Sequence, residues 1–150
     1  MSHTKILVVD DFLPWQQFVL EMFESHGAGS NIIYFALDGL EAVEKAQQLQ
    51  PDLILMDVSL PVMNGFEAAR KIRGLSPRSK ILFVSELRGR DYIQGAFEAG
   101  ASGYILKSDA NSDLFQGIAA ALGDRQFISR SLKDLAQKLR FRRIRRGMLH

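Results

Sequence analysis

The sequence predicts an α/β domain built on a parallel β-sheet with helices on both faces. Short apolar runs alternate along the chain with stretches that place apolar residues three and four positions apart, the pattern of helices with one buried face. The runs are continuously apolar, which indicates strands buried on both sides. With 150 residues, 47% of them hydrophobic, the chain has the size and composition of one such domain with a short appendage.

Five strand-helix units are predicted in succession. The expected strands span residues 6–9, 31–36, 53–56, 81–84 and 104–106, and the expected helices span 12–25, 39–49, 66–73, 90–99 and 111–122. Pro14 suits the first turn of the first helix, and the second helix stops before Pro51. In the loop after the third strand, Asn64-Gly65 favours a turn that needs a positive φ.

The chain divides into a body, residues 1–123, and a linker with a helical extension and basic tail, residues 124–150. In this extension, Ser131 with Asp134 three residues later resembles a helix start, and Leu132 and Leu135 continue one apolar face. We expect this helix to pack against the body, a second copy or a further domain.

Composition and charge exclude several classes of protein. There is no cysteine, so neither disulfides nor thiolate metal sites carry the fold. No apolar stretch approaches the length of a membrane span, and the N-terminus leaves no room for a signal peptide, so we expect a cytoplasmic protein. Six of the 19 basic residues lie in 138–150; residues 1–137 hold 13 basic and all 17 acidic residues, a net charge of −4. The high overall isoelectric point therefore does not indicate a nucleic-acid-binding body.

Polar side chains directly follow four of the apolar runs. Asp10-Asp11, Asp57, Ser85 and Lys107 occupy these places. Open α/β sheets bind ligands beyond the carboxyl ends of their strands, so three carboxylates, a hydroxyl and an ammonium group would share one pocket. Taken alone, Asp10 and Asp11 also fit a helix-capping pair, and Lys107 a solvated surface lysine.

This set of groups suits phosphoryl transfer. Crowded carboxylates repel one another unless a cation intervenes, and Mg²⁺ is a hard cation that prefers their oxygens. Asp57, on the central strand, is the best candidate for a nucleophile that forms an aspartyl-phosphate, with Lys107 pairing with a phosphoryl oxygen. Ser85 could donate a hydrogen bond to that group, and Tyr104 could change rotamer as Ser85 moves.

The same residues carry a family resemblance. Val8 to Asp11, the run from Leu55 to Glu67, Val84-Ser85 and the run from Ala99 to Lys107 closely resemble the CheY-like receiver domain of two-component response regulators, over residues 4–122. Within it, the segment 100–104 is most similar to receivers of the LuxR/NarL/FixJ type, in which a helix-turn-helix domain follows. Residues 124–150 are too few for that domain.

The resemblance implies a flavodoxin-like, doubly wound (βα)5 sheet with strand order 2-1-3-4-5. It implies that a sensor histidine kinase phosphorylates Asp57, and that Lys107 contacts the phosphate. Ser85 and Tyr104 are the implied switch pair. The implied Mg²⁺ ligands are the side chains of Asp10, Asp11 and Asp57 and the backbone carbonyl of Ser59.

Two substitutions depart from the family pattern, and alternatives stay open. Glu86 stands where a small residue is usual, so a carboxylate would lie near the phosphate, and Ser85 replaces the commoner threonine.

The expected output is a protein or homodimer contact surface of a transcriptional regulator. A stand-alone receiver, or DNA binding through a missing effector domain or the basic tail, is the alternative. An aspartyl-phosphate hydrolase is disfavoured because Ser59 stands where such enzymes need a second carboxylate.

Overall fold

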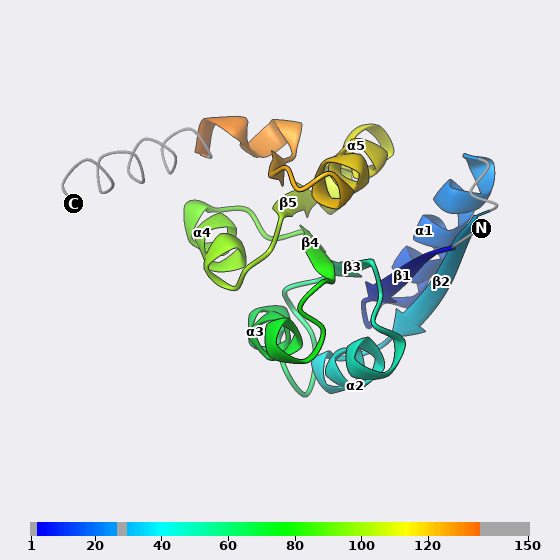
Figure 1. Cartoon of the computed structure of the whole chain (residues 1–150). Coiled ribbons are helices and arrows are strands. Elements are labelled where there is room, and N and C mark those ends of the chain that lie inside the picture. Colours follow the sequence, from blue (N-terminus) through cyan, green and yellow to red (C-terminus); the bar gives the residue numbers. More distant parts are fainter. Residues whose placement is uncertain (1–2, 27–29, 136–150) are drawn as a thin grey trace.

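The computed structural model describes residues 3–26 and 30–135. Its centre is a parallel sheet of six strands in the order β2-β1-β3-β4-β5-β6 (Figure 1). The strands are β1 Thr4–Val9, β2 Asn31–Ala36, β3 Leu53–Met56, β4 Lys80–Ser85, β5 Gly103–Leu106 and β6 Phe127–Ile128. The predicted order of the first five strands is confirmed.

Five α-helices connect and cover the strands. They are α1 Leu13–Ser25, α2 Gly39–Leu49, α3 Gly65–Leu75, α4 Arg90–Glu98 and α5 Ala110–Leu122, with a short 3-10 turn, η1, at Lys107–Asp109. Each lies within a few residues of its predicted position. In the described parts of the chain, none of the helices is long and apolar enough to cross a membrane.

Two apolar clusters, one on each face of the sheet, hold the layers together. On one face, Val19 and Phe23 of α1 meet Leu114 and Ile118 of α5. On the other, α2, α3 and α4 contribute residues such as Ile72 and Ile93 (Figure 1). The strands are buried on both sides, as their continuous apolar runs predict.

Side-chain caps fix the starts of α2 and α3. The carboxylate of Asp38 accepts a hydrogen bond from the Glu41 N–H, and the amide oxygen of Asn64 accepts one from the Glu67 N–H. Asn64 has φ −69°, and Gly65 opens α3, so the interpretation of this pair as a positive-φ turn is wrong. The positive φ of this loop belongs to Val62, at 68°.

The extension begins with structure that the sequence did not predict. Phe127 and Ile128 form β6, parallel to the edge of β5, and the 3-10 turn η2, Arg130–Leu132, follows. Leu132 is buried in the same cluster as α4, and Leu135 packs against it. Residues 133–135 are helical, which confirms a helical extension, whereas its continuation through 136–139 and the basic tail lie outside the described residues. The boundary at Gly123 stays a prediction.

Candidate functional site

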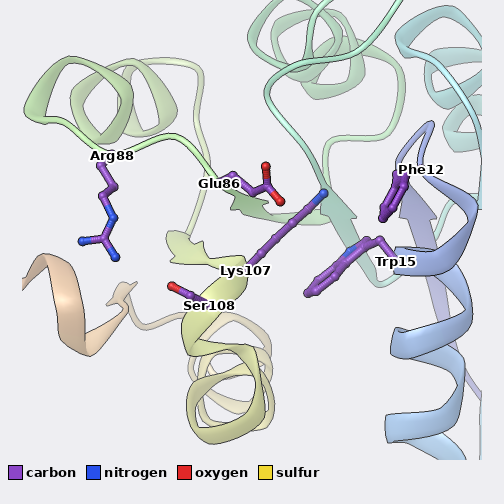
Figure 2. Close-up of a pocket in the computed structure, with 6 residues that line it drawn as sticks. All are labelled: Phe12, Trp15, Glu86, Arg88, Lys107 and Ser108. Atoms are coloured by element: carbon purple, nitrogen blue, oxygen red, sulfur yellow. The ribbon is translucent and has the colours of Figure 1, made fainter.

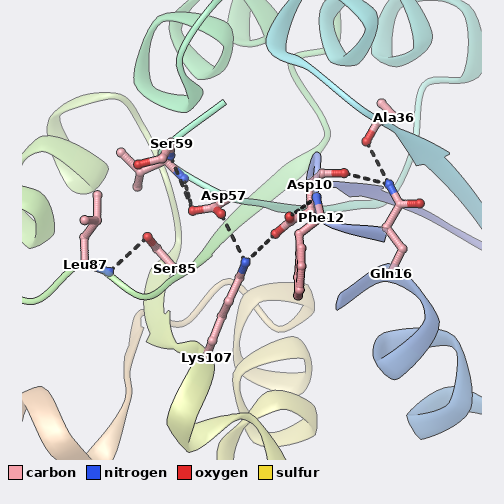
Figure 3. Close-up of polar contacts among 10 residues, drawn as sticks. Asp10, Phe12, Gln16, Ala36, Asp57, Ser59, Ser85, Leu87 and Lys107 are labelled. Carbon is pink, nitrogen blue, oxygen red and sulfur yellow. Dashed lines mark hydrogen bonds and ion pairs between the residues drawn. The ribbon is translucent and has the colours of Figure 1, made fainter. Parts of the chain in front are cut away.

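Four polar side chains meet at the carboxyl end of the sheet. Asp10 follows β1, Asp57 follows β3, Ser85 ends β4 and Lys107 follows β5. These four strands are consecutive neighbours, so their ends form one row, and Figure 3 shows the side chains converging there. The sequence-based expectation of a shared site therefore holds for these residues.

Lys107 bridges the two buried carboxylates. Its Nζ donates a hydrogen bond to Asp57 Oδ2 at 3.2 Å and lies 2.7 Å from Asp10 Oδ2 (Figure 3). The lysine stem reaches this position across Trp15 of α1, with Nζ 5.0 Å from the centre of its indole ring. The short contact with Asp10 is a charged pair, and among the described residues Asp10 Oδ2 has no other polar partner.

Backbone groups hold the other oxygen of each carboxylate. Asp57 Oδ1 accepts hydrogen bonds from the N–H groups of Val58, at 2.7 Å, and Ser59, at 3.4 Å. Asp10 Oδ1 accepts the N–H of Phe12 at 2.8 Å. Asp10 thus also fixes the turn into α1, which is close to its capping interpretation, although α1 has no side-chain cap of its own.

Burial and charge shift the ionisation of the ion pair. Burial raises the pKa of the Asp10 carboxyl, and the contacts with Lys107 and the Phe12 N–H offset only part of the rise. Burial alone would lower the pKa of the Lys107 ammonium group. The two carboxylates outweigh that effect and hold the pKa above its ordinary value, so Lys107 stays charged.

Ser85 and Tyr104 are joined through Leu87, in the loop between β4 and α4. Ser85 Oγ accepts the N–H of Leu87 at 3.2 Å, and the Tyr104 hydroxyl donates to the Leu87 carbonyl at 2.6 Å. Tyr104 is fully buried, and burial raises its pKa to about 12. The structure therefore connects both residues of the predicted switch pair to one loop residue, whereas the rotamer change stays a prediction.

The sequence of residues 6–119 matches the family described as the response regulator receiver domain. The chain belongs to this family. Protein CcdB of Bacillus subtilis (strain 168) is 31% identical over 120 residues, which are 80% of this chain and 98% of that protein. The transcriptional regulatory protein LnrK of the same organism is 42% identical over 83 residues, and the match spans 55% of this chain but only 37% of LnrK.

Solved structures agree with this assignment. The crystal structure of a two-component response regulator of the LuxR family from Aurantimonas sp. SI85-9A1 is 33% identical, with a TM-score of 0.82, over 95% of this chain and 99% of that chain. The response regulator domain of Thermotoga maritima CheB is 30% identical, with a TM-score of 0.73, over 81% of this chain and 97% of that domain. Receiver domains are phosphoacceptor switches, interact with histidine kinases and generally bind Mg²⁺ at the phosphorylation site.

The donor set of this receiver domain fits a hard divalent cation in part. Within residues 3–26 and 30–135, the buried Asp10 Oδ2 is paired only with the Lys107 ammonium group, which also contacts the Asp57 carboxylate, and carboxylate oxygens of this kind suit Mg²⁺. Asp11 is exposed, and across residues 3–26 and 30–135 no three metal-ligating side chains already form a cluster. Asp10, Asp57 and Asp11 as joint ligands, with the Ser59 carbonyl, therefore stay a prediction.

A pocket of about 450 Å³ opens beside Lys107. It is lined by Phe12, Trp15, Glu86, Arg88, Lys107 and Ser108 (Figure 2). The structure thus places the carboxylate of Glu86 in the same pocket as Lys107. Arg88, which no sequence motif singled out, adds a second basic side chain to the same pocket.

Sequence reasoning also missed Gln16. This buried residue of α1 donates from Nε2 to the carbonyl oxygens of Asp10, at 2.8 Å, and Ala36, at 3.1 Å (Figure 3). It therefore joins the ends of β1 and β2 next to Asp10. A glutamine between the apolar positions Trp15 and Val19 was the available signal, because a polar side chain on a buried helix face needs partners.

Proposed function

We propose that this receiver accepts a phosphoryl group on Asp57 from a sensor histidine kinase and thereby changes a protein contact surface. The observation that carries the proposal is the contact of Lys107 Nζ with both Asp57 and Asp10. In the transfer, the P–N bond of a phosphohistidine breaks as a carboxylate oxygen of Asp57 forms the new P–O bond. The imidazole leaves and takes up a proton.

Residues around Asp57 supply positioning and charge for this step. The Val58 N–H orients the carboxylate through Oδ1, and the ammonium group of Lys107 is placed to pair with a phosphoryl oxygen. Asp10, Asp11, Asp57 and the Ser59 carbonyl would hold Mg²⁺, which neutralises charge on the transferring group. A hydrolase is the weaker candidate. Such an enzyme needs a second carboxylate two residues after the nucleophile, and Ser59 at that position donates only its N–H to Asp57.

The switch would act through Leu87. A phosphoryl group on Asp57 offers Ser85 a new acceptor, and movement of the serine would disturb its bond to the Leu87 N–H and, through the Leu87 carbonyl, the buried hydroxyl of Tyr104. Tyr104 lies on β5, between α4 and α5 (Figure 1). The surface of α4, β5 and α5, in which β6 covers the edge of β5, is therefore the proposed output, for binding a partner protein or a second copy.

The likeness to the LuxR-family structure and to LnrK supports a role as the regulatory part of a transcriptional regulator. The match along nearly all of CcdB keeps a stand-alone receiver as the alternative. DNA binding by residues 138–150 alone would require affinity that falls steeply with salt and disappears when those residues are removed.

Intact-mass measurement after incubation with phosphoramidate and Mg²⁺ tests the central chemistry. We expect one added phosphoryl group on the parent protein and none on Asp57→Ala. Asp52→Ala, which removes a carboxylate at the other end of β3, is the control and should be phosphorylated like the parent. Equal labelling of Asp57→Ala, or no labelling of the parent, would refute the proposal.

A further inference from the structure

The segment of β6 and η2, residues 127–132, extends the hydrogen bonding of β5 toward the phosphorylation site. Beyond the pairing of Tyr104 with Ile128, the Ser129 N–H donates to the Tyr104 carbonyl at 3.0 Å. The Leu106 N–H then donates to Ser129 Oγ at 3.1 Å. Ser129 is fully buried, so its hydroxyl replaces a backbone partner that the edge of β5 would otherwise lack.

Two buried carboxylates of η1 and α5 anchor the same segment. Asp109 accepts the N–H of Ser131, at 3.1 Å, and its hydroxyl, at 2.7 Å. Asp113 accepts the N–H of Arg130, at 2.8 Å, and its Nε, at 3.1 Å. The hydroxyls of Ser131 and Ser129 outweigh the effect of burial and hold the pKa of Asp109 below its ordinary value, so the anchor is charged at neutral pH.

The body is shaped to receive β6. A Cβ added to Gly103 would lie 2.3 Å from the carbonyl oxygen of Phe127, and one added to Gly117 would lie 3.1 Å from the Phe127 ring. Both glycines permit a close approach that a side chain would block. Leu132 completes the attachment by entering the cluster that contains Tyr104.

These contacts hold the chain on both sides of Lys107. Ser129 binds the residue immediately before it, Leu106, and Ser131 binds Asp109, two residues after it. The backbone that carries Lys107 is therefore fixed by a segment that lies beyond the family match, which ends at residue 119.

We propose that Ser129 is a positioning residue for Lys107, so that attachment of the 127–132 segment and phosphorylation of Asp57 influence each other. The second half of this inference rests on the proposed function; the first half does not. Coupling between two sites is reciprocal, so a segment that adjusts the lysine must itself respond when a phosphoryl group engages that lysine.

Trp15 provides a direct readout, because it is the only tryptophan and Lys107 Nζ lies over its ring. We expect Ser129→Ala to change Trp15 emission in the same direction as Lys107→Ala. In a Lys107→Ala background, Ser129→Ala should cause no further change, because its effect passes through the lysine. Gln126→Ala is the control: it shortens an exposed side chain directly before β6 and keeps both bonds of Ser129 to β5, so its emission should equal that of the parent.

Phosphorylation of Asp57 by phosphoramidate gives the second readout. We expect a rate about tenfold lower in Ser129→Ala and a change of less than about twofold in Gln126→Ala. Parent-like emission in Ser129→Ala, or an equal emission change with and without Lys107, would overturn the positioning role. Absence of phosphorylation in the parent would refute the proposed function, while the emission measurements would still decide the role of Ser129.

A measurement on the parent protein alone covers the case in which Ser129→Ala does not fold. Amide hydrogen exchange of residues 127–132 is compared with and without beryllofluoride and Mg²⁺, with Asp57→Ala as the control that should not respond. A change of protection in the parent supports the coupling. Unchanged protection, with beryllofluoride bound, would refute it.

Discussion

Replacing either of two glycines of α3 by alanine should have opposite effects on the free energy of unfolding. A Cβ on Gly65, the first residue of the helix, would lie 2.2 Å from the carbonyl oxygen of Asp57 and 3.0 Å from the ring of Phe83. A Cβ on Gly74, near the end of the helix, would meet no atom of residues 3–26 and 30–135 within 4 Å. Gly65→Ala therefore pushes against the backbone of Asp57, whereas Gly74→Ala meets no atom of the described residues.

The two effects on the free energy of unfolding can be estimated separately. Alanine restricts the unfolded chain and favours helix, so Gly74→Ala should raise the free energy of unfolding by about 0.5–1 kcal/mol. At Gly65 the obstacle is backbone, and overpacking of this kind costs about 1–3 kcal/mol, which exceeds that gain. Because the gain applies at both positions, the two variants should differ by the overpacking cost, about 1–3 kcal/mol, with the parent between them.

Urea unfolding followed by circular dichroism measures the difference, and the rate of Asp57 phosphorylation reports the local effect. We expect slower phosphorylation in Gly65→Ala and a parent-like rate in Gly74→Ala. A Gly65→Ala protein as stable as Gly74→Ala would refute the reasoning, because it would show that the contact between α3 and Asp57 relaxes at no cost.

Two further predictions concern the site. Glu86→Gln should speed phosphorylation by a small anionic donor about threefold at low salt, the effect of removing one exposed like charge, and the gain should shrink at high salt. Glu98→Gln, at the end of α4, is the control; a gain independent of salt would contradict the charge argument. Tyr104 has its pKa raised from 10.0 to about 12, so its contribution to stability is complete below pH 10 and is lost as the pH rises through 12. Tyr104→Phe should lower the free energy of unfolding by about 1 kcal/mol at neutral pH, and the fall of this free energy above pH 10 should become shallower. Urea unfolding across this pH range measures both effects. A fall as steep as that of the parent would contradict the raised pKa of Tyr104.

The sheet and the polar residues at its edge were predictable because both depend on short-range signals. Strands buried on two faces must be continuously apolar, and a parallel sheet brings their carboxyl ends together whatever lies between them. The sequence alone thus predicts that Asp57 and Lys107, 50 positions apart, lie side by side.

The features that sequence reasoning missed depend on tertiary contacts. Phe127 and Ile128 are too short a run to show a period, and they form β6 because Gly103 lets their backbone approach β5. Gly65 is a second example. The sequence suggests that it is needed for a positive φ, whereas the structure shows that it is needed because a side chain would collide with the backbone of Asp57. A glycine looks the same in the sequence whichever of these two demands it meets.

The sharing of Lys107 explains why phosphorylation would have consequences beyond Asp57. A phosphoryl group carries about 1.5–2 negative charges at neutral pH, more than the carboxylate that it modifies. An ammonium group drawn toward it would leave the buried Asp10 Oδ2 without its counter-charge, and the part of the chain that the structure describes offers this oxygen no other polar partner. An unpaired buried carboxylate is costly, so the phosphorylated state needs a further cation near Asp10 or a changed position of Lys107. A changed position of Lys107 would act on the backbone that Ser129 holds, which is the physical reason to expect the 127–132 segment to respond.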